Sequence, residues 1–229
     1  MDSATIIIPV KDEEVGLDYL YRDFGESKIA DFIDVEFIFI VDHRTSDSSR
    51  EVARKLSDNV IDQAETTGKG AAIKQAVEKW KSEPTKYAIF LDADGSYSFS
   101  SVMDVISHLR DGADVVSGSR FLHGSGSPEG MSRLHGFGNR FLSKLSSIRN
   151  RKKISDLCTG LWGFKLEALN KIEISSTGFD LEAELFGQCR RKGLSHVESP
   201  VEWSQRKGGV SKLRSMRDGF IILMRIIRT

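Results

Sequence analysis

Short runs of apolar residues, many of them β-branched or aromatic, alternate with amphipathic segments through the first half of the chain. Runs of this kind are typical of strands that are buried on both faces of a parallel sheet. The expected strands are Thr5–Val10, Val35–Asp42, Asn59–Gln63, Tyr87–Asp92 and Ala113–Arg120. The expected helices between them include one ending near Phe24, one capped by Thr45 or Ser46, and one over Ala71–Trp80. This alternation predicts an α/β fold with a mostly parallel central sheet, flanking helices and right-handed crossovers.

The pattern changes after Arg120. Residues 121–155 are rich in Gly, Ser, Arg and Lys, and a helix is expected near Arg140–Ile148. A segment of this length is too long for a structureless loop without a function. Strand and helix resume at "LWGFKL", and the chain closes with "HVESPVEW", a basic turn and a last helix.

The charge balance and the cysteines exclude several classes of protein. The 229 residues include 33 basic and 33 acidic side chains, so the formal net charge is zero, which argues against bulk nucleic-acid binding. Cys158 and Cys189 have no spacing typical of a disulfide framework or a metal site. We recognise no signal peptide and no apolar run of about 18–20 residues that would span a bilayer. We therefore expect one large domain in a reducing, cytoplasmic setting.

Polar residues follow the expected strands where each strand ends. In open α/β sheets the ligand site lies beyond these carboxyl ends. The positions gathered there are Glu13, Asp42, Gly68-Lys69-Gly70, Asp92 with Asp94, and Arg120. Together they outline a pocket with carboxylates and a cation on one rim.

Asp92 and Asp94 are the most informative pair. They stand one residue apart at a strand end, and Gly95 allows the chain to bend so that both carboxylates face one point. Such a pair repels unless a proton or a metal joins it. Hard oxygen ligands, too few for a closed cage, favour Mg²⁺ or Mn²⁺ completed by water and ligand phosphates. The alternative is that the two aspartates cap the following helix.

Over almost its whole length the chain resembles family 2 glycosyltransferases with the GT-A, or nucleotide-diphospho-sugar transferase, fold. Within that family it is most similar to the dolichyl-phosphate mannose and glucose synthases. The resemblance rests on "IIIPVKDEE", "VDHRTSDSS", "GKGAAIKQA", "DADGSYS" and "VVSGSRF", in that order, and on the late segment "VEWSQRKGGVSKL". It implies an inverting, metal-dependent enzyme that transfers a hexose from GDP-mannose or UDP-glucose to a polyprenyl (dolichyl) phosphate.

The resemblance also implies roles for individual residues. Asp92 and Asp94 would bind the metal ion, and Asp94, Arg120, Arg206, Lys212 and Glu184 would serve catalysis. The nucleotide-binding positions would be Pro9, Val10, Glu13, Asp42, Lys69, Asp92 and Ala93. The acceptor and its phosphate would meet Arg133, Asp156, Arg206 and Lys212.

Three further sets of residues in the second half carry expectations of their own. In "GFDLEAEL", Glu184 or Asp180 is expected to line the sugar pocket, against a solvated helix face that also carries Glu182. The segment "SDLCTGLWGFK" resembles the family's acceptor side, which implies that Asp156 and Thr159 meet sugar hydroxyls. Trp162 and Phe164 are expected in the core rather than as sugar platforms.

Three positions depart from the family pattern. His43 stands where the family usually has a second acid, and Arg44 where it often has glycine. Ser96 replaces a glutamine of some mannose synthases. These differences bear on base and sugar specificity rather than on the class of reaction.

Residues 211–229 form a basic amphipathic segment after an expected catalytic domain of residues 1–210. A helix of this kind can lie on an anionic membrane surface, which predicts a peripheral position on the cytoplasmic face near a lipid-linked acceptor. The alternatives are a closing helix packed on the domain, with its arginines reaching solvent, or membrane helices that follow in a longer protein.

Other functions remain possible at this level. A soluble family 2 transferase would act on a saccharide or small molecule instead of a lipid. A nucleotidyltransferase would share the acidic pair, but "PVKDEEVGL" lacks the glycine-rich basic loop expected after its first strand. A phospho-acceptor regulatory domain would also have aspartates at strand ends, but would not need the long basic insertion.

Overall fold

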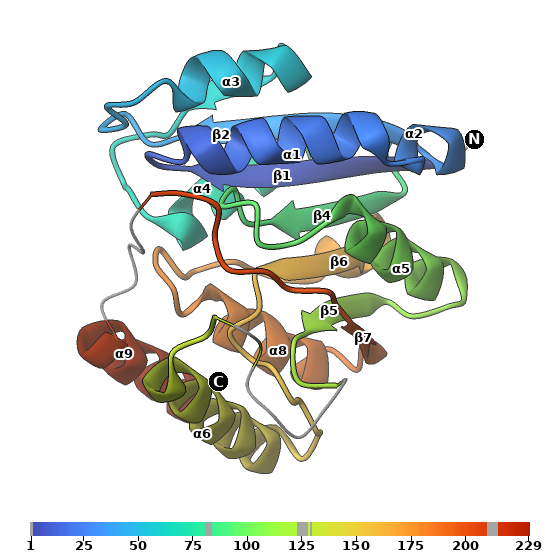
Figure 1. Cartoon of the computed structure of the whole chain (residues 1–229). Coiled ribbons are helices and arrows are strands. Elements are labelled where there is room, and N and C mark those ends of the chain that lie inside the picture. Colours follow the sequence, from blue (N-terminus) through green and yellow to red (C-terminus); the bar gives the residue numbers. More distant parts are fainter. Residues whose placement is uncertain (1, 81–83, 123–127, 129, 210–214) are drawn as a thin grey trace.

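The computed structural model describes residues 2–80, 84–122, 128, 130–209 and 215–229. Within these ranges, helices cover both faces of a seven-stranded central sheet (Figure 1). The strand order is β3-β2-β1-β4-β6-β5-β7, and every pair is parallel except the two that involve β6. The expected α/β fold with a mostly parallel sheet is therefore confirmed. The strands are β1 (Ser3–Val10), β2 (Asp34–Val41), β3 (Val60–Asp62), β4 (Tyr87–Leu91), β5 (Val115–Ser119), β6 (Leu161–Lys165) and β7 (His196–Pro200).

The direction of β6 matters for the site. Because β6 runs antiparallel to β4, its beginning lies beside the end of β4, and Leu161 pairs with Leu91. The residues just before β6 therefore reach the same edge of the sheet as the residues just after β1, β2, β4 and β5. Segments that are far apart in the sequence meet at this edge.

Two apolar clusters hold the helices on the sheet. Successive side chains of a strand point to opposite faces, so Ile6 and Ile8 of β1 enter one cluster and Ile7 enters the other. Cores of this kind supply most of the stability of a domain. The first cluster includes residues of α1 (Glu14–Glu26), α2 (Ile29–Phe32), α3 (Ser49–Leu56) and α5 (Phe99–Arg110). The second includes residues of α4 (Lys69–Trp80), α6 (Arg133–Asn150), α7 (Leu166–Leu169), α8 (Leu181–Arg191) and α9 (Ser215–Arg228).

Some helix boundaries differ from the sequence-based expectation. Helix α3 begins at Ser49 with Ser48 as N-cap, not with Thr45 or Ser46. The reason is that residues 42–45 form a turn, closed by the Thr45 backbone N–H on the Asp42 carbonyl at 2.9 Å, and that the Ser46 backbone N–H then donates to Asp12 Oδ1 at 2.8 Å. Helix α6 begins at Arg133, well before the expected Arg140, and ends at Asn150, close to the expected Ile148.

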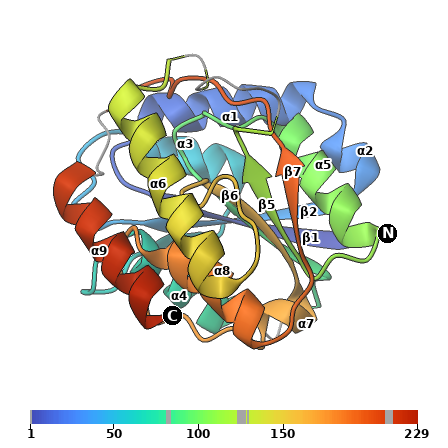
Figure 2. The ribbon, with the colours of Figure 1, turned by 90° about the horizontal axis from the view of Figure 1, so that it is seen from below.

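Helices α6 and α9 lie side by side on one face of the molecule (Figure 2). Helix α9 buries Ile222 and Ile226 in the second cluster, so one side of this helix packs on the domain. Across the described ranges, each helix is either too short or too polar to cross a lipid bilayer.

Candidate active site

Asp92 and Asp94 lie in the loop directly after β4, the place expected from the sequence. Asp94 Oδ1 accepts a hydrogen bond from the Ser96 backbone N–H at 3.0 Å, and Gly95 has φ +70°, so the chain turns sharply. Helix α5 is capped by Ser98, whose hydroxyl accepts from the Ser101 backbone N–H at 3.3 Å. Neither aspartate caps that helix, so the alternative interpretation of the pair fails.

Backbone packs closely around the two aspartates. A Cβ atom on Gly16 of α1 would lie 2.3 Å from the Ala93 carbonyl oxygen and 2.7 Å from Asp94 Cα. On the β6 side, the Asp92 backbone N–H donates to the Gly160 carbonyl at 3.1 Å. The loop is therefore clamped between α1 and the start of β6, which fixes where both carboxylates point.

Lys69 joins Asp92 to a third acid. Its Nζ lies 2.7 Å from Asp92 Oδ1 and 2.6 Å from Glu182 Oε1. Burial alone lowers the pKa of Lys69, but the two carboxylates outweigh it and raise the net pKa above the ordinary value. Lys69 thus stays charged and holds Asp92 in place.

The pKa of the Asp94 carboxyl is raised above its ordinary value. Burial raises the pKa of Asp94, and the nearby charge of Asp92 raises it further. A cation between the carboxylates would relieve this repulsion. No group of three or more His, Cys, Asp or Glu side chains suited to a metal occurs in the described part of the chain. Two hard carboxylates that leave several positions to water and phosphate fit Mg²⁺ or Mn²⁺.

A late segment of the chain crosses the end of β4. The backbone N–H groups of Ser204 and Lys207 donate to the Ser96 and Asp94 carbonyls, both at 3.0 Å. This places Arg206 Nη2 2.6 Å from Glu13 Oε1 and 3.8 Å from Asp94 Oδ2. Glu13, Asp94 and Arg206 are thus brought together, although Glu13 and Arg206 are separated by 193 positions in the sequence.

Asp42 at the end of β2 is held by its neighbour Arg44. The guanidinium donates to Asp42 Oδ1 at 2.9 Å and to Oδ2 at 2.6 Å. These side-chain hydrogen bonds, with one from the Arg44 backbone N–H, outweigh burial and lower the pKa of Asp42 to about 2. The Asp42 side chain is 3% exposed and that of Arg44 is 53% exposed, so solvent meets the cation rather than the acid.

Arg120 and Asp156 form a second bidentate pair. Arg120 Nε and Nη2 lie 2.6 Å and 2.7 Å from the two Asp156 oxygens, and Asn139 Nδ2 donates to Asp156 Oδ1 at 2.5 Å. Asp156 is fully buried, so it holds Arg120 in place instead of facing an acceptor. Thr159 is also fully buried and lies 3.2 Å from the Tyr97 hydroxyl, away from solvent.

The acids at the start of α8 divide between two sides of the helix. Asp180 and Glu184 pair with Arg225 of α9, at 2.7 Å and 3.1 Å. The acid that is linked to Asp92 is instead Glu182, because Lys69 pairs with both of these carboxylates. All three acids are buried, so the solvated-face alternative also fails. Sequence reasoning missed Glu182 because three acids at alternate positions do not reveal which one faces the sheet edge.

The remaining predicted positions vary in their surroundings. Val10 and Ala93 are buried, Pro9 is half-buried, and the Val10 carbonyl accepts from the Asp42 backbone N–H at 2.9 Å. Arg133 is exposed in the first turn of α6. Lys212 lies outside the described residues. Trp162 and Phe164 are 1% and 0% exposed, which confirms their place in the core.

Two of the sequence comparisons concern archaeal proteins. The chain is 27% identical to "Glycosyltransferase AglJ" of Haloferax volcanii over 99% of this chain and 72% of that protein. It is 31% identical to "Dolichyl-phosphate hexose transferase" of the same organism over 80% of this chain and 77% of that protein. A mycobacterial protein, "Polyprenol monophosphomannose synthase" of Mycolicibacterium smegmatis, is 26% identical over 77% of this chain and 69% of its own length.

Among solved structures, the chain is similar to glucosyl-3-phosphoglycerate synthase from Mycobacterium tuberculosis, crystallised with Mn²⁺, uridine diphosphate and phosphoglyceric acid. The TM-score is 0.73 at 16% identity, with 99% of this chain and 78% of that chain covered. This likeness supports the GT-A fold. The family model "Glycosyl transferase family 2" matches residues 5–173. The chain therefore belongs to glycosyltransferase family 2 and is a glycosyltransferase with the GT-A fold.

Proposed function

We propose that this enzyme transfers a hexose from a nucleotide-diphospho-sugar to a polyprenyl phosphate at a membrane surface. The observation that carries the proposal is the chain of charges at one sheet edge. Glu13 contacts Arg206, Arg206 lies near Asp94, and Asp92 contacts Lys69. A diphosphate needs cations and a metal at the same place where a nucleoside needs hydrogen-bond acceptors. This edge has cationic side chains, carboxylate acceptors and two aspartates that would hold the metal.

The donor would bind across this edge. Glu13 would accept hydrogen bonds from the nucleoside, beside the backbone of Pro9, Val10 and Ala93. Asp42 would do the same once the exposed Arg44 side chain turns away from its carboxylate. A Mg²⁺ or Mn²⁺ ion on Asp92 and Asp94 would stabilise the charge that develops on the leaving diphosphate. Arg206 is close enough to these carboxylates to turn toward a phosphate oxygen, where a charge-assisted bond is strong.

The sugar would lie on the Lys69 side of the loop. Glu182 is better placed than Glu184 to line the sugar pocket, because Lys69 pairs with both Glu182 and Asp92. Arg120 would meet phosphate oxygens of donor or acceptor, and Arg133 and Lys212 those of the acceptor. Asp156 would act by orienting Arg120.

The reaction would be a single in-line displacement. An oxygen of the lipid phosphate forms a bond to C1 of the hexose while the bond from C1 to the nucleoside diphosphate breaks, which inverts the configuration. The acceptor phosphate is already anionic near neutral pH, so the enzyme need not supply a strong general base. Its residues position the two substrates and neutralise the departing charge.

Exposed apolar side chains on α6 and α9 support a membrane surface as partner. Single exposed apolar residues are ordinary, but a group on neighbouring helices points to an interaction surface. The same two helices carry exposed basic residues, among them Arg140, Lys144 and Arg217, as expected for contact with anionic lipid. The exposed fractions are 65% for Leu134, 72% for Phe137, 54% for Phe141, 67% for Ile148, 85% for Met216 and 63% for Phe220. We propose that residues 1–210 form the catalytic domain and that residues 211–229 form a membrane-proximal segment that follows it.

A binding and transfer experiment tests the proposal. Thermal shifts are measured with UDP, GDP and their hexose conjugates, with and without MnCl₂, for the wild type and Asp94→Ala. We expect stabilisation by one nucleoside diphosphate that requires Mn²⁺ and is lost in the variant. Transfer of labelled hexose is then compared between dolichyl phosphate and free saccharides. Transfer to the saccharides alone would favour the soluble transferase, and equal or absent responses to all nucleotides would refute the proposal.

A further inference from the structure

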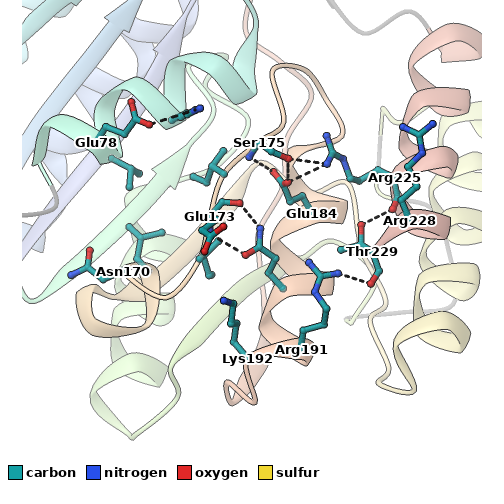
Figure 3. A pocket seen from close by; sticks show the side chains of 16 residues that line it. Glu78, Asn170, Glu173, Ser175, Glu184, Arg191, Lys192, Arg225, Arg228 and Thr229 are labelled. Carbon is teal, nitrogen blue, oxygen red and sulfur yellow. Dashed lines mark hydrogen bonds and ion pairs between the residues drawn. The ribbon is translucent and has the colours of Figure 1, made fainter.

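Arg225 of α9 reaches into a cluster of buried acids at the start of α8. Its Nε donates to Asp180 Oδ2 at 2.7 Å, and its Nη1 donates to Glu184 Oε1 at 3.1 Å and to Ser175 Oγ at 3.0 Å. Figure 3 shows Arg225 pointing from α9 toward Glu184 and Ser175. The carboxylate side chains are 8% and 5% exposed, so Arg225 supplies most of the charge that compensates them.

The same acids order the segment that leads into α8. Glu184 accepts hydrogen bonds from the backbone N–H groups of Ser175 and Ser176, at 3.0 Å and 2.8 Å. The Ser176 hydroxyl donates to Asp180 Oδ1 at 2.5 Å. Arg225 therefore closes a network that fixes residues 175–180.

This segment lies directly against the beginning of α4. A Cβ atom on Gly68 would lie 2.4 Å from the Thr177 carbonyl oxygen, and one on Gly70 would lie 2.6 Å from that of Ser176. The Ala71 backbone N–H donates to the Thr177 carbonyl at 3.2 Å. Contacts this close allow little independent movement, so residues 175–178 determine the position of Lys69.

Helix α8 gives a second connection to the same lysine. Asp180 and Glu184 are four positions apart and share one side of the helix start, whereas Glu182 projects away from them. With Asp180 and Glu184 held by α9, the rotation of α8 is fixed and Glu182 is directed to Lys69, 2.6 Å away.

We infer that Arg225 is a positioning residue for the donor site and acts on Lys69 and Asp92 through α8 and residues 175–178. The inference rests on the proposed role of Asp92 in donor binding. Arg225 itself does not reach the substrate. It holds Asp180, Glu184 and the turn that contains Gly68 and Gly70 in the arrangement that keeps Lys69 paired with Asp92.

A cleft beside Arg225 bears on how variants would behave. This cleft, of about 780 Å³, lies between α4, α8 and α9, and Arg225, Glu184 and Ser175 are among its lining residues (Figure 3). Water can enter from it and hydrate the acids when Arg225 is replaced. We therefore expect Arg225→Met to fold while losing the orientation of the network.

The test compares the wild type, Arg225→Met, Arg225→Lys and a control, Arg22→Met. Arg22 also pairs with a carboxylate, that of Asp18, but on the exposed side of α1. Binding of UDP and GDP with MnCl₂ is measured by calorimetry. We expect Arg225→Met to bind the preferred diphosphate about 10- to 100-fold more weakly, as when a group that orients a ligand-binding residue is lost. Arg225→Lys should recover part of the affinity, and Arg22→Met should match the wild type.

Hydrogen exchange of the ligand-free proteins provides a readout that is independent of nucleotide. In Arg225→Met we expect faster exchange at residues 68–72 as well as in α9, because the effect passes through residues 175–178. Unchanged diphosphate affinity in the folded variant, or faster exchange confined to α9, would overturn the inference. Should Arg225→Met not fold, Asp180→Asn and Arg225→Lys carry the same measurements. A wild type that binds neither diphosphate would refute the proposed function, and exchange would still decide the role of Arg225.

Discussion

Gly160 lies directly against the carboxylate of Asp92: a Cβ atom at position 160 would stand 1.9 Å from Asp92 Oδ2 and 2.3 Å from its Cγ. This contact exists because β6 is antiparallel to β4 and begins where β4 ends. The space that a glycine leaves open is therefore occupied by the acid assigned to the metal.

Gly160→Ala is expected to abolish most transfer while leaving the fold intact. The new methyl group must push the Asp92 carboxylate aside, and a displacement of about 1 Å at a reacting centre can cost on the order of 100-fold in rate. Mn²⁺-dependent transfer and thermal unfolding are measured together. As a control, Gly138→Ala adds a methyl group where a Cβ atom meets nothing within 4 Å, and it should keep full activity. Normal activity in Gly160→Ala would contradict the assignment of Asp92.

Lys69→Met is expected to destabilise the protein by on the order of 3 kcal/mol, because it leaves the buried Glu182 without its charge partner. The double variant Lys69→Met/Glu182→Leu removes both charges and should recover part of this loss. Both variants should lack hexose transfer, since Asp92 has lost its ion pair with Lys69 in each of them. Urea unfolding and transfer rates check these expectations, and a double variant as unstable as the single one would argue against the pair.

The stability of the protein should fall as the pH falls below neutrality, in part through His196. Burial, with a smaller effect from Lys152, lowers the pKa of His196 to about 3, and its Nε2 lies 2.9 Å from the Ser117 hydroxyl. Its pKa in the unfolded chain is about 6.5, so below this pH the unfolded state binds a proton that the folded state does not. His196 therefore leaves the free energy of unfolding unchanged above about pH 6.5. Below this pH it lowers the free energy of unfolding by up to about 1.4 kcal/mol per pH unit.

Unfolding of the wild type and His196→Gln by urea at pH 7.5, 6 and 5 tests this dependence. Glutamine cannot take up the proton, so the free energy of unfolding of the variant should change less with pH. Parallel pH profiles for the two proteins would show that another group is responsible.

Phe137→Ser combined with Phe220→Ser should weaken binding to anionic vesicles. These side chains are 72% and 63% exposed, on α6 and α9, and each buried aromatic side chain contributes about 1.5–3 kcal/mol. Nucleotide binding should not change, since neither residue belongs to the proposed nucleotide site. Tyr21→Ser, at a 44% exposed residue of α1, is the control. Vesicle sedimentation is compared for the wild type, the double variant and Tyr21→Ser. Equal sedimentation of all three would exclude the α6–α9 face as the membrane contact.

The layered fold and the sheet edge at which the site lies could both be predicted from the amino-acid pattern. Apolar runs that end in acids place Asp42, Asp92 and Asp94 after parallel strands, because such runs are buried strands and their carboxyl ends share one edge of the sheet. The antiparallel direction of β6 was not visible, since a short apolar run carries no information about its orientation.

Which charged side chains form pairs depends on long-range packing and could not be predicted from local patterns. Residues two apart at a helix start project in different directions, so only the packing of α8 on α9 selects Glu182 for Lys69 and leaves Glu184 to Arg225. Likewise, Arg206 reaches Glu13 only because residues 203–209 hydrogen-bond across the β4 loop. Local patterns fix which side chains a strand or helix presents, whereas long-range packing fixes the partner that each side chain finds.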